Sequence, residues 1–201
     1  MAANGVGDAQ KLVDGVNIPT DWSPDGRFLL FFRRSEKTRS DIWILPMEGA
    51  QKPYPLINSA GDDYLARFSP DGGWIAYASD ESGTQEVYVR SFTSDGHVGP
   101  DRERVSSSGG FQPSWRKDGK ELFYVSPKGE MISIPVNRSG TRIEFGTPAA
   151  LFKTLAPIAG RTLGTYDVTP DGRRFLLGEF IGESANAMPT VILNWPGILP
   201  R

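Results

Sequence analysis

Side chains that could do chemistry are few in this chain and stand apart from one another. His97 is the only histidine, within a loop-like run of Ser, Asp, Gly and Pro, and there is no cysteine. A proton shuttle would need a partner that no motif supplies, so we interpret His97 as a surface loop residue. The pairs Asp62–Asp63 and Asp80–Glu81 could in principle act as carboxylate ligands or as acid–base pairs. Adjacent residues on a strand point to opposite faces, and adjacent loop carboxylates are usually solvated, so we expect no catalysis from them.

The known catalytic motifs are also missing. Gly182-Glu-Ser-Ala-Asn departs from a nucleophile elbow at its last position, and no Walker-type phosphate loop occurs. Ser69-Pro-Asp-Gly-Gly comes near the Asp-box of sialidase-type propellers, but the other turns lack the later glycine. The absence of cysteine excludes a disulfide framework and a thiolate zinc site, and one histidine cannot make a histidine-rich metal site. We therefore predict no enzyme centre, no metal and no cofactor.

Charge and hydropathy exclude two classes of partner. The formal net charge is −2, which gives no bulk attraction to nucleic acid or to an anionic membrane. No apolar run reaches the roughly 18 residues of a membrane span, and the first residues lack the basic and apolar regions of a secretory signal. We expect a soluble chain, cytoplasmic or periplasmic. The densest basic group is interpreted as a solvated loop and comprises Arg33, Arg34, Lys37 and Arg39.

An internal repeat predicts the architecture that must position any site. Asp-Gly pairs begin at positions 25, 71, 118 and 171, so successive copies lie 46, 47 and 53 residues apart. This period fits a propeller blade of four strands. Each Asp-Gly pair lies between two apolar runs, and the aligned segments are Asp21–Phe32, Arg67–Ala78, Ser114–Val125 and Asp167–Gly178.

The repeated segment predicts a hairpin on physical grounds. In the first copy, the Ser23 hydroxyl can bond the turn backbone and Pro24 sets φ near −65°. Gly26 supplies the left-handed residue that closes the turn. The other repeats contain further apolar runs with the period-two alternation of strands, as in Glu86–Phe92.

We therefore predict an all-β fold, a β-propeller of four-stranded antiparallel blades with about four blades in this chain. Residues 1–9 are expected to be a flexible leader and residues 196–201 a tail, and the blades are placed at about 15–57, 62–106, 110–152 and 163–195. The fourth repeat lacks an outermost strand, whereas Gln10–Val13 is an orphan strand at the other end. Either these four blades close as a small ring, with Gln10–Val13 beside Thr190–Trp195, or they form part of a larger ring.

An aromatic residue followed by Ser-Pro-Asp-Gly, at Trp22–Gly26 and Phe68–Gly72, resembles the blades of TolB-like, WD-repeat-like propellers. The resemblance covers about residues 10–195, and the third and fourth copies keep only part of the motif, including Asp-Gly. The run Val191–Trp195 resembles the end of propellers that follow a kinase or DNA-binding regulator domain in bacterial sensor proteins. The resemblance implies a sensor or scaffold portion that binds proteins, peptides or small ligands at the entrance of the ring.

In such a ring the innermost strands line a central channel and the loops that enter them form a rim. The rim residues predicted to contact a ligand are Asp62, Asp63, Tyr64, Gln112, Arg161 and Tyr166. The residues predicted to line the channel, at one equivalent position, are Asp21, Arg67 and Asp167, with Ser114 in the third copy. The aromatic residues expected to pack between blades are Trp22, Trp43, Phe68, Trp74 and Trp115.

The sequence thus favours a non-catalytic binding or scaffold propeller that recognises a protein or peptide partner. It would act by self-assembly into a larger ring or as the sensor part of a longer protein. Another copy is a candidate partner through the edge strands Gln10–Val13 and Thr190–Trp195. The alternative is an accessory propeller that gates a serine peptidase or regulates a protein kinase, and a weaker one is a stand-alone propeller acting on glycans.

Overall fold

The computed structural model describes residues 11–35, 39–49, 52–140, 142–154, 166–179 and 190–191. These residues form antiparallel β-sheets and contain no helix. Within the same ranges there is accordingly no helix long and apolar enough to cross a membrane.

Each sheet corresponds to one sequence repeat and is called a blade. Blade 1 consists of β1 (Ile18–Trp22), β2 (Phe28–Ser35), β3 (Arg39–Pro46) and β4 (Tyr54–Ile57). Blade 2 consists of β5 (Asp63–Phe68), β6 (Trp74–Ser79), β7 (Glu86–Phe92) and β8 (Val98–Arg104). Blade 3 consists of β9 (Phe111–Trp115), β10 (Glu121–Val125), β11 (Glu130–Ser139), β12 (Arg142–Phe145) and β13 (Ala149–Lys153). Blade 4 consists of β14 (Tyr166–Val168), β15 (Phe175–Glu179) and β16 (Thr190–Val191).

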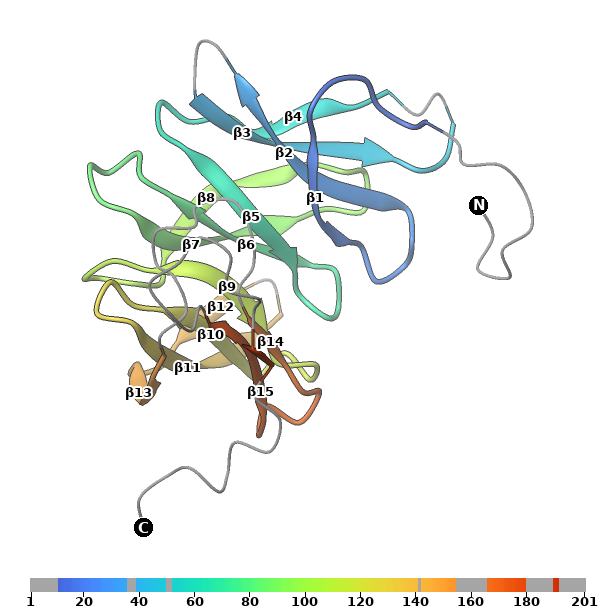
Figure 1. Cartoon of the computed structure of the whole chain (residues 1–201). Coiled ribbons are helices and arrows are strands. Elements are labelled where there is room, and N and C mark those ends of the chain that lie inside the picture. Colours follow the sequence, from blue (N-terminus) through green and yellow to red (C-terminus); the bar gives the residue numbers. More distant parts are fainter. Residues whose placement is uncertain are drawn as a thin grey trace, which may run out of the picture.

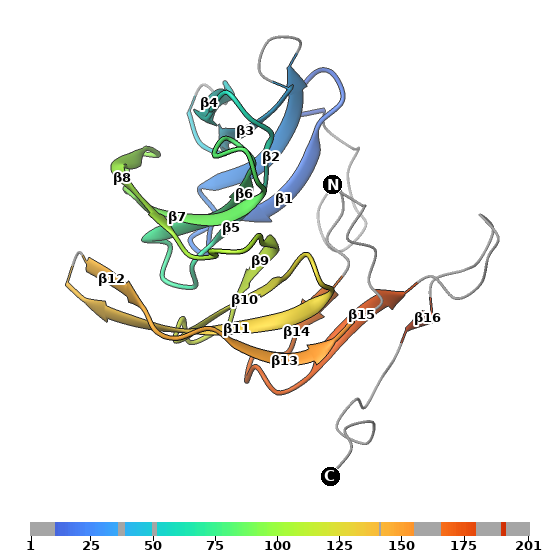
Figure 2. The same cartoon turned by 90° about the vertical axis from the view of Figure 1, so that its left-hand side faces the viewer.

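The blades follow one another along an arc in chain order, from blade 1 at one end to blade 4 at the other (Figures 1 and 2). The first strand of blade 1 contacts the first strand of blade 2, which in turn contacts the first strand of blade 3. First strands are therefore the inner strands of the arc. The prediction of an all-β, partial propeller with about four antiparallel blades is confirmed.

The Asp-Gly hairpins close as the sequence predicts. The amide of Gly26 donates to the Ser23 carbonyl oxygen at 2.8 Å, with φ of +75° at the glycine. The amide of Phe28 donates to the Ser23 hydroxyl at 2.9 Å, and that hydroxyl donates to Asp25 at 2.6 Å. The same positive φ recurs at Gly72, Gly119 and Gly172. Because a side chain is costly in this conformation, the glycines fix the hairpin between the first two strands of every blade.

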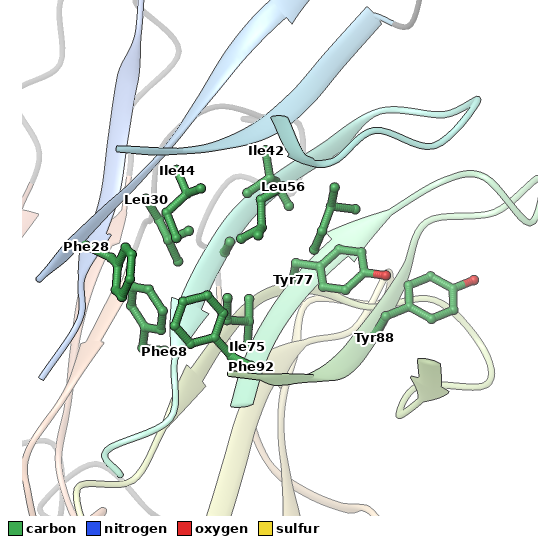
Figure 3. Close-up of a cluster of buried hydrophobic side chains, with 12 residues drawn as sticks. Phe28, Leu30, Ile42, Ile44, Leu56, Phe68, Ile75, Tyr77, Tyr88 and Phe92 are labelled. Carbon is green, nitrogen blue, oxygen red and sulfur yellow. The ribbon is translucent and has the colours of Figure 1, made fainter. Parts of the chain in front are cut away.

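Apolar side chains are buried in three large clusters, one between each pair of neighbouring blades. Figure 3 shows the cluster between blades 1 and 2, which includes Phe28, Leu30, Ile42, Ile44, Phe68, Ile75 and Tyr77. Strand β10 shows how one sheet serves two clusters. Leu122 and Tyr124 face blade 2, whereas Phe123 and Val125 face blade 4. The alternation of a strand thus places apolar residues on both faces of a central blade.

Two of the five aromatic predictions are wrong. Phe68, Trp115 and Trp74 pack in the clusters between blades, as expected. Trp22 is 51% exposed, although it occupies the repeat position of Phe68 and Trp115. At that position the ring faces the preceding blade, and no blade precedes blade 1 among the described residues. Trp43 stacks on Phe31 of its own blade at 6.4 Å, on the face turned away from blade 2.

The predicted strand Gln10–Val13 is also not found where it can be tested. Residue 10 lies outside the described residues, and Lys11, Leu12 and Val13 adopt irregular structure. Gly15 has φ of +88° and the Asn17 side chain donates from Nδ2 to the carbonyl oxygen of Asp14 at 3.1 Å, so the chain turns before β1. At the other end, Thr190–Val191 pairs with β15, and residues 192–195 lie outside the described residues.

Candidate functional site

The inner strands of the first three blades share an irregularity in their pairing with the next strand. The register of β1 against β2 shifts between Pro19 and Asp21, and that of β5 against β6 shifts between Tyr64 and Arg67. Leu65 in β5 and Gln112 in β9 occupy equivalent positions, with φ of 54° and 55°. Non-glycine residues in this left-handed region are strained and concentrate at binding sites. The same distortion thus recurs on the inner strands of blades 2 and 3.

A cavity of about 420 Å³ lies on this surface, and we call it the channel pocket. Residues from all four blades line it: Asp21, Leu65, Arg67, Phe68, Pro70, Gln112, Pro113, Ser114, Trp115, Tyr166 and Asp167. Its volume lies within the range of small-ligand sites. The pocket brings together six of the ten residues predicted from sequence: Asp21, Arg67, Gln112, Ser114, Tyr166 and Asp167.

Asp21 and Arg67 link blade 1 to blade 2 at the wall of this pocket. The Asp21 carboxylate accepts from its neighbour Trp22 N at 2.9 Å and from Phe68 N of the next blade at 2.8 Å. Burial raises the pKa of Asp21, and these bonds together with the Arg67 charge act in the opposite direction. Arg67 donates from Nη1 to the Thr20 carbonyl oxygen at 2.6 Å. The Arg67 side chain is still 39% exposed, so part of the guanidinium is open to a ligand.

Tyr166 and Asp167 form the opposite wall. The Tyr166 hydroxyl donates to the Gln112 carbonyl oxygen at 2.7 Å, and burial raises its pKa, so the hydroxyl keeps its proton at neutral pH. The Asp167 carboxylate accepts from Val168 N at 2.8 Å, which repeats the bond between Asp21 and Trp22 N. Asp167 is exposed, and the described residues contain no following blade that could supply a second amide. The pocket thus combines one accessible guanidinium with an exposed carboxylate.

The remaining predicted rim residues lie elsewhere. Asp62 and Tyr64 line a second cavity between blades 1 and 2, described below as the rim pocket. Asp63 is buried and accepts from Ser59 N at 2.7 Å and from the Ser59 hydroxyl at 3.0 Å, so it holds the loop that enters blade 2. Burial raises the pKa of Asp63. Arg161 lies outside the described residues.

Sequence reasoning did not assign Leu65, Pro70 or Trp115 to a ligand site. Trp115 was expected only to pack between blades, and it does so while one part of it lines the channel pocket. Leu65 lines the pocket because of its left-handed backbone, for which a leucine gives no signal in sequence. The sequence signal was the residue directly before the aromatic position of each inner strand, and the four residues that it gave all line the pocket: Asp21, Arg67, Ser114 and Asp167.

His97, the only histidine of the chain, does not line the channel pocket. It lies beside the Tyr54 ring, with ring centroids 5.8 Å apart. Across the described ranges, no group of three or more His, Cys, Asp or Glu side chains is arranged to hold a metal ion.

Solved structures of known proteins share this architecture at low sequence identity. Among solved structures, TolB from Acinetobacter baumannii is 19% identical, with a TM-score of 0.61, and the match covers 88% of this chain and 40% of TolB. A putative TolB from Agrobacterium tumefaciens is 20% identical, with a TM-score of 0.52, covering 69% of this chain and 52% of that one. The periplasmic gluconolactonase PpgL from Pseudomonas aeruginosa is 17% identical, with a TM-score of 0.53 and coverages of 87% and 56%.

These likenesses establish the fold, and the chain spans about half the length of the structures it matches. No curated protein sequence matches it. The family model described as TolB beta propeller domain matches residues 6–149, which is most of the chain. The chain therefore belongs to the TolB beta propeller domain family.

Proposed function

We propose that this chain is a non-catalytic binding module that recognises a polar segment of a protein partner in the channel pocket. The observation that carries the proposal is the convergence of side chains from four blades on one cavity, with Arg67, Gln112, Tyr166 and Asp167 beside Trp115. Convergent polar side chains of this kind fix the orientation of a ligand in its site. Membership of a propeller family supports a binding role at the coarse level.

The charges of the pocket suggest what the segment carries. Both oxygens of Asp21 already accept backbone amides, whereas Asp167 is exposed and accepts one. A lysine or arginine of the partner can pair with Asp167, and a carbonyl or carboxylate oxygen can accept from the open side of Arg67. We expect a peptide segment with at least one basic residue.

The test is selection of a random heptapeptide library against the chain, followed by calorimetric titration of the enriched peptide. The double variant Arg67→Gln/Asp167→Asn should weaken binding by about tenfold or more, since it removes both charged partners. The matched control Arg104→Gln/Asp101→Asn makes the same charge change at exposed positions of β8 and should bind as the wild type does. Failure to enrich any peptide, or equal weakening by the control, would contradict the proposal.

A second role, in assembly, is favoured by the two ends of the arc. Trp22 is exposed where Phe68 and Trp115 pack on a preceding blade. Asp167 accepts the amide of the residue that follows it, as Asp21 does. The second carboxylate oxygen of Asp21 also accepts an amide of the following blade, that of Phe68. We infer that blade 4 of one copy accepts blade 1 of another, with Trp22 in the position of Phe68. Completion by further blades of a longer protein would use the same groups.

Light scattering over a dilution series measures this role. Head-to-tail pairing predicts a species heavier than the 22.0 kDa monomer, which returns to the monomer mass on Trp22→Ser. A wild-type chain that stays monomeric at all concentrations rejects self-assembly. In the alternative role, as an accessory propeller of a peptidase or kinase, the two ends of the arc would contact the catalytic domain.

A further inference from the structure

The second cavity lies between blades 1 and 2 and is separate from the channel pocket, with which it shares no lining residue. Its volume is about 560 Å³, and we call it the rim pocket. The residues that matter for its chemistry are Ile18, Phe32, Arg34, Arg39, Asp62 and Tyr64. Arg34 and Arg39 belong to the basic group that sequence reasoning interpreted as a solvated loop.

The floor of the rim pocket is apolar and rigid. Phe32 and Tyr64 are 4% and 2% exposed, and their rings lie 6.3 Å apart at an angle of 55°. Ile18 packs against the same small cluster. An aromatic or branched aliphatic group placed on this floor would contact side chains that are already held by the core.

The charged wall is held in place by an interblade network. Arg39 has φ of 65°, a strained conformation for an arginine. Its Nη1 lies 3.2 Å from an oxygen of Asp80 and 3.5 Å from an oxygen of Asp62, and Asp62 N donates to Asp80 at 2.7 Å. These contacts link Arg39 in β3 of blade 1 to Asp62 and Asp80 of blade 2, and the Arg39 side chain remains 63% exposed.

Arg34 is the second arginine of the rim pocket, and it takes no part in this network. It follows Phe32 by two residues on β2, so it lies on the same face, directly beyond the apolar floor. Within the described residues Arg34 forms no ion pair, whereas Arg39 has two acidic neighbours. Among the residues that the structure describes, the pocket thus presents the Arg34 guanidinium without an acidic partner, next to an apolar surface.

We propose that the rim pocket binds a small amphipathic carboxylate, with its aryl or alkyl body on the Phe32–Tyr64 floor and its carboxylate paired with Arg34. A ligand without the carboxylate would not form the charged pair with Arg34, and a ligand without the apolar body would leave the Phe32–Tyr64 floor in contact with water. The site is independent of peptide recognition in the channel pocket, because no residue serves both.

The probes are phenylacetate, 3-phenylpropionate and 4-phenylbutyrate, each paired with its neutral amide, titrated into the whole chain and followed by ligand-detected NMR. At least one acid should bind, and its amide should bind about tenfold more weakly, since only the acid forms the charged pair. Arg34→Gln should weaken the acid by a similar factor and leave the amide unchanged. Arg104→Gln, an equally charged change at an exposed position outside the pocket, should leave both unchanged.

The Arg34 side chain is not part of the core, so the variant is expected to fold, and its thermal unfolding midpoint checks this. Absence of binding by all three acids at 10 mM overturns the proposal, as does equal binding of acid and amide. Loss of binding in Arg67→Gln but not in Arg34→Gln would place the ligand in the channel pocket and would also overturn it.

Discussion

The equivalent aspartates of blades 1 and 4, Asp21 and Asp167, allow a direct test of how the blades are joined. They occupy the same position of the repeat, and each accepts the amide of the residue that follows it. Only Asp21 also accepts an amide of the next blade, from Phe68 at 2.8 Å. Alanine at either position removes one carboxylate and one unit of negative charge, so the two variants differ in the interblade bond.

The expected cost follows from that bond. Asp21→Ala leaves the half-buried amide of Phe68 without its acceptor, which costs about 1–3 kcal/mol. Burial raises the pKa of Asp21, so removal of the desolvated charge offsets part of this cost, and we expect a net loss of about 2 kcal/mol at neutral pH. Asp167→Ala removes a bond on an exposed strand and should cost no more than about 0.5 kcal/mol.

Urea unfolding of both variants, followed by far-ultraviolet circular dichroism at a concentration where the chain is monomeric, measures the two free energies. Asp21→Asn keeps one acceptor oxygen and should fall between the wild type and Asp21→Ala. Equal losses in the two alanine variants, or a larger loss for Asp167→Ala, would refute the interblade role of Asp21.

Three further outcomes follow from the packing. Gly61→Ala would place a Cβ 2.5 Å from Asp80 Oδ1 and 2.6 Å from the Glu81 amide, so it should cost about 2 kcal/mol in urea unfolding. Gly73→Ala, whose nearest neighbour lies at 3.8 Å, should change stability by less than about 0.5 kcal/mol, and equal effects would contradict the packing. Burial raises the folded-state pKa of Asp63 above its unfolded value of 3.8, so between the two values the folded state retains a proton and stability falls as pH rises. Asp63→Asn should flatten the unfolding free energy in that range, and an unchanged slope would count against the burial argument. Leu30→Ala should cost about 2–5 kcal/mol because Leu30 is completely buried between blades 1 and 2, and a loss below about 1 kcal/mol would contradict that placement.

The part of the fold that depends on local chemistry was predictable from sequence. The Asp-Gly turns form because Gly26 and its equivalents tolerate positive φ, and this tolerance is predictable from the residue type alone. The burial of Phe68 and Trp115 follows from their repeat positions. Trp22 shares the position and is exposed, because burial there depends on a preceding blade and not on the residue itself.

The parts of the site that depend on tertiary structure were not predictable. Leu65 and Gln112 take left-handed backbones because the inner strands bulge, and neither residue type favours that conformation. The sequence places Asp63 on the rim beside Asp62. Adjacent strand residues point to opposite faces, and the Asp63 side chain is directed toward Ser59 in the loop that enters blade 2. The third and fourth Asp-Gly pairs lie 53 residues apart, and the interval between them includes the additional strand β12. This strand pairs with the end of β11, and the sequence pattern of a blade did not predict it.

The most direct test of binding in the channel pocket is a hydrogen–deuterium exchange map of the chain with and without the selected heptapeptide. Binding there predicts slower exchange in the inner-strand segments around Arg67, Ser114 and Asp167, and no change in the outer strands β4, β8 and β13. Protection confined to the outer strands, with the inner strands unchanged, would contradict the assignment of the channel pocket as the binding site.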